Sequence, residues 1–149
     1  SVFASSGYGR GTIRLKLAVD GKKVTVSEAW LNPELDNAHG GIVLVNGRIY
    51  GAAHKKPAWV CLDAETGKTL CRDPWLGAAI VCADGNIYSL AEKGTAGLID
   101  CSSDKCNIVS KFDLPKTDNG MCWAHPAICN GRLYIRHGDR LYAYDVKGE

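Results

Sequence analysis

The feature that most constrains this chain is a short pattern that occurs three times: an apolar run, an Asn-Gly or Asp-Gly pair, and a second apolar run that ends in Tyr. A two-residue type I′ turn needs positive φ at both central positions, which Asn, Asp and Gly tolerate best. Each copy therefore predicts a tight β-hairpin. The three copies are the segments 42–50, 80–88 and 127–134.

These hairpins recur at a regular interval. Their closing residues Tyr50, Tyr88 and Tyr134 are spaced by about 40 to 45 residues, and Phe3 takes the same position near the start of the chain. Between them, short runs rich in Val, Ile, Leu and Tyr alternate with Gly, Asn and Asp, and no segment keeps a helical period. An all-β chain with this period predicts a β-propeller of four-stranded antiparallel blades.

The predicted strands can be assigned to blades, lettered A to D from the innermost strand to the outermost. Two blades are complete, with strands A to D at 42–45, 48–53, 58–63 and 68–72, and at 78–83, 86–91, 95–101 and 107–113. Two are incomplete, with strands B to D at 2–5, 11–18 and 24–30, and strands A to C at 126–129, 132–136 and 140–145. The approximate blade limits are 1–30, 38–72, 76–113 and 123–149.

The blade assignment predicts a partial propeller, because the first blade lacks strand A. We expect residues 1–149 to form the C-terminal part of one longer propeller domain. Such a part exposes blade faces and an unpaired strand edge. Self-association of two copies to close a ring is one way to cover them.

Composition excludes several partners. The 149 residues include 18 basic and 16 acidic side chains, for a formal charge of +2. This balance argues against a nucleic-acid partner or an anionic membrane surface. No apolar run approaches the roughly 20 residues of a transmembrane segment. The first residues, 1–5, have neither the basic start nor the apolar core of a signal peptide.

Cysteine usage is high for a chain of this size. The seven cysteines are Cys61, Cys71, Cys82, Cys101, Cys106, Cys122 and Cys129. Their number is odd and none forms a C-x-x-C pair, so no zinc site is predicted. Most lie in apolar strand patterns, and we interpret them as small buried hydrophobic residues. Cys101 and Cys106 flank a predicted turn, and the spacing of a hairpin allows a disulfide there.

The residues also resemble a known repeat. Segment 58–68, Ala-Trp-Val-Cys-Leu-Asp-Ala-Glu-Thr-Gly-Lys, resembles the signature of PQQ-like repeats, and 141–145 resembles the same part of a last blade. Segments 38–42 and 123–128 are similar to the starts of inner strands in bacterial PQQ-like repeat proteins. The family often has a Trp on strand D where this chain has Cys71, which implies weaker blade packing there. The resemblance covers nearly the whole chain and implies a quinoprotein dehydrogenase-like β-propeller.

Within the repeat signature we expect structural roles. Asp63 and Thr66 can hydrogen-bond within the turn, and Gly67 supplies a permissive φ. The glycine-rich segment 8–11 joins two predicted strands and opens no helix, so it does not predict a phosphate site. Neither feature is interpreted as catalytic.

Candidate ligand-binding residues lie on one face of the predicted propeller. The D–A and B–C loops share this loop face, and the A–B and C–D turns share the opposite turn face. Loops of this kind are where binding residues concentrate. The candidates are His39, His54, Trp75, Trp123, His125, Arg136 and His137. In the alternative interpretation each histidine caps a loop by bonding backbone groups, and Arg136 with His137 forms a solvated turn.

Two functions compete. The first is a propeller scaffold of the bacterial cell envelope, periplasmic or secreted by resemblance, that binds a small molecule or an envelope protein. The second is a quinoprotein dehydrogenase that oxidises an alcohol or sugar with PQQ and calcium. Enzymes of that class often hold PQQ against a disulfide between adjacent cysteines, and this sequence has no Cys-Cys pair. No nucleophile elbow indicates a hydrolase. We therefore predict the binding scaffold, with no catalytic residue and no metal ligand in this chain.

Overall fold

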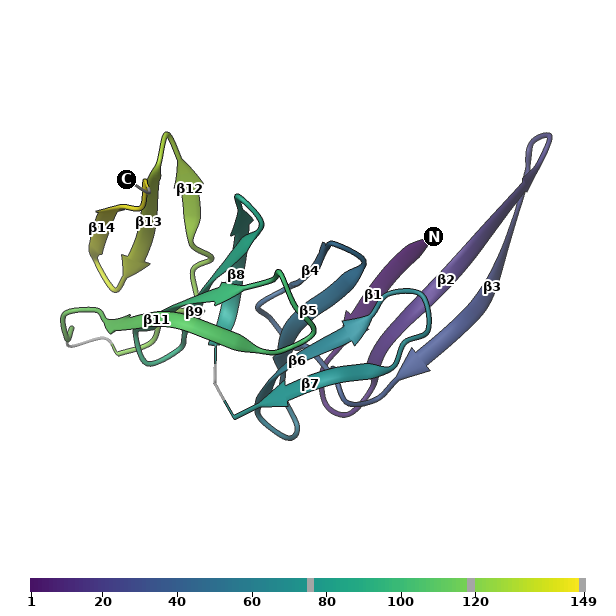
Figure 1. Cartoon of the computed structure of the whole chain (residues 1–149), viewed down its shortest axis with the longest axis horizontal. Coiled ribbons are helices and arrows are strands. Elements are labelled where there is room, and N and C mark those ends of the chain that lie inside the picture. Colours follow the sequence, from purple (N-terminus) through teal and green to yellow (C-terminus); the bar gives the residue numbers. More distant parts are fainter. Residues whose placement is uncertain (75–76, 118–119, 148–149) are drawn as a thin grey trace.

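The computed structural model describes residues 1–74, 77–117 and 120–147. In these residues the chain forms strands, turns and loops, and its four antiparallel sheets follow one another in chain order along the long axis of the molecule (Figure 1). No helix in this part of the chain is long and apolar enough to cross a membrane.

Each sheet is built from consecutive strands. The first sheet contains β1 (Val2–Ser6), β2 (Gly11–Asp20) and β3 (Lys23–Asn32), and the second contains β4 (Ile42–Val45), β5 (Arg48–Ala53), β6 (Ala58–Asp63) and β7 (Thr69–Asp73). The third contains β8 (Gly77–Ala83), β9 (Asn86–Ala91), β10 (Thr95–Asp100) and β11 (Asn107–Asp113), and the fourth contains β12 (Ala127–Cys129), β13 (Arg132–His137) and β14 (Arg140–Asp145).

The tight hairpins confirm the turn prediction. Asn46 and Gly47 have φ of 50° and 75°, as a type I′ turn requires, and the pairs Asp84-Gly85 and Asn130-Gly131 also have positive φ at both positions. The prediction of an all-β partial propeller with two four-stranded and two three-stranded sheets is confirmed as well. One difference is hairpin β2–β3, which is longer than predicted and extends away from the other sheets (Figure 1).

The core consists of three apolar clusters, one between each pair of consecutive sheets. The second sheet shows how the sequence produces them. Ile49 pairs with Leu62 on the face that packs against the first sheet, whereas Tyr50 pairs with Cys61 on the face that packs against the third. Alternate residues of one strand therefore enter different clusters. This is why β6 is apolar along almost its whole length.

The first and second sheets are joined by Trp30. Its ring lies over Gly67, where a Cβ atom would come within 2.5 Å of the indole, and its Nε1 donates to the Ala64 carbonyl at 3.2 Å. Gly67 has φ of 73°, and the Thr66 hydroxyl donates to the Asp63 carboxylate at 2.7 Å. The predicted structural role of this turn is confirmed: it forms a flat surface for an aromatic ring of the preceding sheet.

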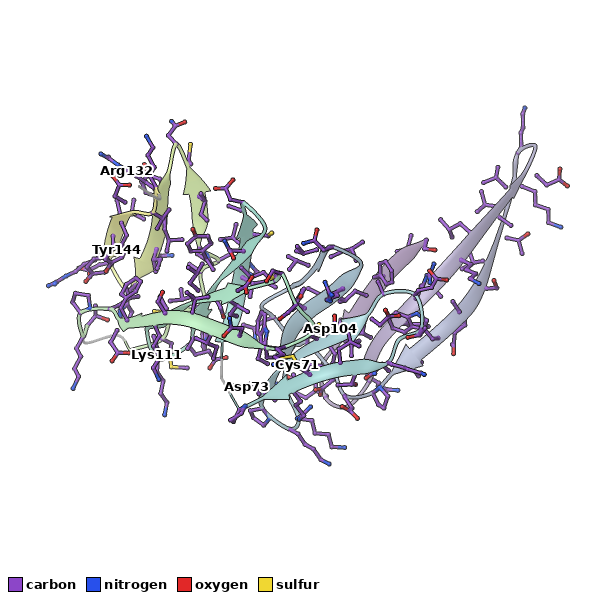
Figure 2. The ribbon with its side chains drawn as sticks, in the orientation of Figure 1. Cys71, Asp73, Asp104, Lys111, Arg132 and Tyr144 are labelled. Atoms are coloured by element: carbon purple, nitrogen blue, oxygen red, sulfur yellow. A yellow bond between two sulfur atoms is a disulfide. The ribbon has the colours of Figure 1, made fainter. Side chains whose placement is uncertain are left out.

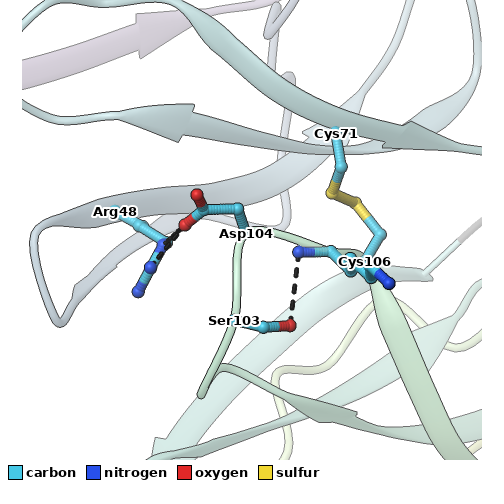
Figure 3. The surroundings of a disulfide bond; sticks show 6 residues. Arg48, Cys71, Ser103, Asp104 and Cys106 are labelled. Carbon is cyan, nitrogen blue, oxygen red and sulfur yellow. Dashed lines mark hydrogen bonds and ion pairs between the residues drawn. A yellow bond between two sulfur atoms is a disulfide. The ribbon is translucent and has the colours of Figure 1, made fainter.

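The second and third sheets are joined covalently. Cys71 of β7 forms a disulfide with Cys106, just before β11, with their Cα atoms 5.8 Å apart (Figures 2 and 3). Where the repeat family often has Trp packing, this chain has a cross-link between sheets. Nearby, Arg48 Nε donates to Asp104 Oδ1 at 2.6 Å across the same boundary (Figure 3).

The sequence left a Cys101–Cys106 disulfide open as a possibility, and the structure shows a different pairing. Stacking of the sheets places Cys71 opposite Cys106, whereas Cys101 is fully buried as a free thiol. Burial raises the pKa of the Cys101 thiol to about 11, so it remains protonated. The interpretation of the other cysteines as buried holds for Cys61 and Cys122 but is wrong for Cys82 and Cys129, which are exposed.

Candidate functional site

The loop face is organised around the carboxylate of Asp36. This side chain is only 2% exposed, and it accepts backbone N–H bonds from Gly9 at 2.7 Å, His54 at 2.9 Å and Lys55 at 3.0 Å. Burial alone would raise the pKa of Asp36, but the backbone donors outweigh it and hold the pKa below its ordinary value. Asp36 therefore fixes the loop between the first two sheets against two neighbouring loops.

Asn37 continues this network toward the third sheet. Its side-chain amide donates to the Ala52 carbonyl at 2.9 Å and accepts from the Gly41 N–H at 3.0 Å. Gly40, just before Gly41, lies so close to the start of β8 that an added Cβ would fall 1.4 Å from the Ala78 carbonyl oxygen. Only glycine permits this approach of two backbones.

A pocket of about 520 Å³ opens on the loop face between the second and third sheets. Most of its wall is made of small apolar residues, which leave space where larger side chains would fill it. The pocket is lined by Asn37, Ala38, His39, Gly40, Ala52, Ala53, His54, Pro57, Ala58, Pro74, Ala78, Ala91, Glu92, Lys93 and Thr95. Its volume is within the range of small-molecule sites.

The polar side of the pocket carries a paired histidine. His39 Nε2 lies 2.9 Å from Glu92 Oε1, and the two side chains are 44% and 36% exposed. They come from different sheets: His39 precedes β4 and Glu92 follows β9. The pair therefore spans the boundary between the second and third sheets at the pocket.

His54 lines the pocket beside a second aromatic residue. The rings of His54 and Tyr8 meet edge to face with centroids 4.7 Å apart. Tyr8 is 80% exposed and has φ of 59°, a conformation that is uncommon outside glycine and that often marks functional loops. Tyr8 extends the polar rim from the pocket toward the first sheet.

The structure places the other described candidate residues outside the pocket. His125 lies near the loop that carries His39, since a Cβ on Gly41 would be 3.7 Å from its ring, but it does not line the pocket. Trp123 is exposed outside the pocket, and Arg136 donates through Nε to the Gly138 carbonyl at 3.1 Å. Trp75 lies outside the described residues.

His137 departs from the interpretation of a solvated turn. It is buried beside Gly94, and neither ring nitrogen has a hydrogen-bond partner within the described residues. The packing of the third sheet on the fourth, invisible in the local sequence, encloses its ring. His137 therefore belongs to a different inter-sheet boundary from the pocket.

The sequence candidates include none of Asp36, Asn37, Glu92 and Lys93. All four are polar loop residues, which is a weak signal in a chain whose loops are polar. What distinguishes them is the meeting of loops from different sheets, as in the contact of His39 with Glu92. That meeting depends on how the sheets stack.

Comparison with known proteins identifies the fold. No family model and no curated protein matches the sequence. Among solved structures, a europium-containing methanol dehydrogenase is similar with a TM-score of 0.57 and 16% sequence identity, over 72% of this chain and 23% of that chain. The chain thus spans less than a quarter of that protein's length. At this identity the likeness shows the fold alone, and it agrees with the partial β-propeller.

The cofactors that the repeat resemblance implies do not fit the described residues. No group of three or more His, Cys, Asp or Glu side chains in residues 1–74, 77–117 and 120–147 is arranged to hold a metal ion. Calcium in proteins is coordinated by six to eight oxygen ligands, most often carboxylates and carbonyls. The sequence also has no adjacent cysteines to stack against PQQ. We therefore derive no catalytic step through either group.

Proposed function

We propose that this chain belongs to a binding scaffold whose loop-face pocket takes a small organic anion with a compact apolar body. The observation that carries the proposal is the convergence of basic side chains on a small-walled pocket of about 520 Å³. Sites for small molecules combine apolar walls with a few placed polar groups in this way.

The apolar body of the ligand follows from the walls. Ala52, Ala78 and Ala91 line the pocket with side chains no larger than a methyl group, and Ala53 and Ala58 line it while their side chains belong to the cluster packed against the first sheet. Pro57 and Pro74 add rigid rings. A flat ring or a short branched chain would bury apolar surface here at about 25 cal/mol per Å².

The negative charge of the ligand follows from the polar groups that the pocket offers, of which Lys93 is the one left free to pair with an anion. Three basic side chains line the pocket, His39, His54 and Lys93, against one acidic side chain, Glu92. Glu92 is already engaged by His39. Lys93 makes no ion pair within the described part of the chain, so its ammonium group can donate to a carboxylate of the ligand.

The pocket is held in shape before any ligand arrives. Asp36 and Asn37 together bind backbone groups of three segments: Gly9, Gly41 just after His39, and residues 52–55, which include His54. Preorganised loops lose little conformational entropy on binding. This supports a binding role for the loop face over a purely structural one.

The proposed setting is the cell envelope, periplasmic or secreted. The Cys71–Cys106 disulfide supports it, because disulfides persist mainly in oxidising compartments. An envelope protein is the alternative partner for the loop face. It would contact the exposed Tyr8 and Trp123 on that face, and would not need to enter the pocket.

Calorimetry with two matched probes tests the proposal. Benzoate carries a carboxylate on a small ring, and benzamide has nearly the same shape without the charge. We expect benzoate to bind and benzamide to bind at least tenfold more weakly, a difference of about 1.4 kcal/mol. Lys93→Gln should remove that preference, whereas Lys16→Gln, on an exposed position of β2 outside the pocket, should leave it unchanged. Equal affinities for the two probes would refute the anion site.

The second candidate is the PQQ- and calcium-dependent dehydrogenase that the repeat resemblance of segment 58–68 implies, with the groups that hold both cofactors supplied from outside the described residues. The same calorimetric measurement with PQQ and calcium chloride distinguishes it. Heat of binding with PQQ and calcium together, and none with benzoate, would favour the quinoprotein. Binding of benzoate without any effect of calcium would favour the scaffold.

A further inference from the structure

The first sheet has one uncovered apolar face. Leu17 pairs with Val26 and Val19 pairs with Val24, so the four side chains lie on the same face of hairpin β2–β3. All four are exposed, Val19 to 72%. Figure 2 shows the side chains of this hairpin projecting outward with no other sheet beside them. An apolar strip of this kind on a soluble protein usually marks an interaction surface.

This uncovered face has a definite place in the stacking pattern. The opposite face of the first sheet carries Phe3 and Trp30, which pack against the apolar cluster of the second sheet. In the second sheet the face equivalent to the uncovered one holds Ile49 and Leu62, and the first sheet packs on it. The uncovered face of the first sheet is therefore equivalent to the face on which a preceding sheet packs.

The fourth sheet has an uncovered face of the opposite kind. Tyr134 occupies the repeat position of Tyr50 and Tyr88, and both of those residues project toward the next sheet. Tyr134 pairs with Ala143 on the face away from the third sheet, and Leu141, 70% exposed, lies on that same face. This face of the fourth sheet is therefore equivalent to the faces of the second and third sheets that pack against a following sheet.

We propose that a second copy of the chain packs its fourth sheet onto the uncovered face of the first sheet, head to tail. The contact would continue the stacking that already joins the four sheets. Charge supports it: Glu28 lies beside Leu15 on the receiving face, and exposed Arg132 and Arg136 flank Tyr134 on the other. Two copies of four sheets fall within the roughly four to eight blades of closed propellers, and a head-to-tail contact closes such a ring. The contact is independent of the proposed ligand.

Light scattering of the purified chain tests the contact through its solution mass. We expect a dimer, with twice the 16.0 kDa mass of the chain. Val26→Asp places a charge on the receiving face and should weaken the dimer at least about tenfold. Thr25→Asp is the matched control, because Thr25 is also exposed but pairs with Ala18 on the other face of the hairpin. It should leave the dimer intact.

Mixing two variants tests the head-to-tail arrangement. Leu141→Asp on the fourth sheet should also give monomers. A mixture of the Val26→Asp and Leu141→Asp chains retains one unaltered contact and should form a heterodimer, which also shows that both variants are folded. A monomeric wild-type chain at high micromolar concentration would overturn the proposal. So would a dimer that Val26→Asp disrupts and Leu141→Asp does not, because that result means two first sheets face each other.

Discussion

The second and third sheets meet differently at the two ends of their common boundary. Toward the turn face they are fixed by the Cys71–Cys106 disulfide, by the ion pair of Arg48 with Asp104, and by the buried ring of Tyr50. Toward the loop face the same two sheets diverge around a pocket of about 520 Å³.

The difference follows from side-chain size along the same strands. β5 contributes Tyr50 to the closed end and Ala52 to the pocket, and β9 contributes Ile87 to the closed end and Ala91 to the pocket. Large side chains fill the boundary and small ones leave it open. We therefore expect changes at the closed end to alter stability and changes in the pocket to alter binding.

The largest expected effect on stability is an exception to this rule, because it comes from a change in the pocket. Gly40→Ala lies in the pocket wall, but its methyl group would overlap the Ala78 carbonyl oxygen, so the loop that carries Gly40 must move away from β8. We expect a loss of at least about 3 kcal/mol in the free energy of unfolding. Urea denaturation measures it. Gly120→Ala is the control, since a Cβ there meets no atom within 4 Å, and it should change stability by less than about 0.5 kcal/mol. Equal effects of the two changes on stability would contradict the close contact between Gly40 and Ala78.

Removing the disulfide sharpens the comparison at the closed end. The bond joins residues separated by 35 positions, and a cross-link of this length stabilises a protein by about 3 to 4 kcal/mol. The double change Cys71→Ala with Cys106→Ala should therefore lower the midpoint of urea denaturation strongly. Dithiothreitol should destabilise the wild-type chain and not the double variant. Cys82→Ser, at an exposed free cysteine, should have no such effect.

A smaller effect is expected at Asp36, which supports the pocket from behind. Asp36→Asn weakens three backbone contacts and should cost about 1 to 3 kcal/mol at neutral pH. The folded pKa of Asp36 lies below its ordinary value of 3.8, so the contribution of the carboxylate is complete above that value and is lost as the pH falls through the folded pKa. The stability difference between wild type and variant should shrink in acid. A difference that persists there would mean that the charge is irrelevant.

The smallest expected change in stability is at the pocket rim. His39 and Glu92 are partly exposed, so their pair contributes at most about 1 kcal/mol. The change His39→Ala should leave the melting temperature nearly unchanged and abolish benzoate binding, whereas His125→Ala, outside the pocket, should change neither. Scanning calorimetry and titration of the same sample measure both. A collapse of stability would show that these histidines are structural.

Local features of this molecule were predictable from the sequence and contacts between sheets were not. The Asn46-Gly47 turn and the Asp63–Thr66 bond form within a few residues, so their chemistry is visible in the sequence itself. The Cys71–Cys106 bond depends on which strands face each other across two sheets. For that reason the sequence showed only that Cys101 and Cys106 could pair within one hairpin, whereas the structure shows a pairing between blades.

The candidate site shows the same limit. His39 and His54 were selected because they lie on the loop face, and both line the pocket. Loop position alone cannot separate them from His137, which is enclosed at the next boundary. It also gives no reason to select Glu92, whose significance comes from its contact with His39.

We expect ligand binding to be confined to the loop-face end of the boundary between the second and third sheets. The most direct test is a titration of the ¹⁵N-labelled chain with benzoate, followed by the backbone amide signals. We expect the amide signals of Ala53, His54 and Lys93 to shift and those of Arg48 and Asp104 to stay unchanged. A titration without shifts at the pocket, or with shifts of equal size at both ends, would contradict it.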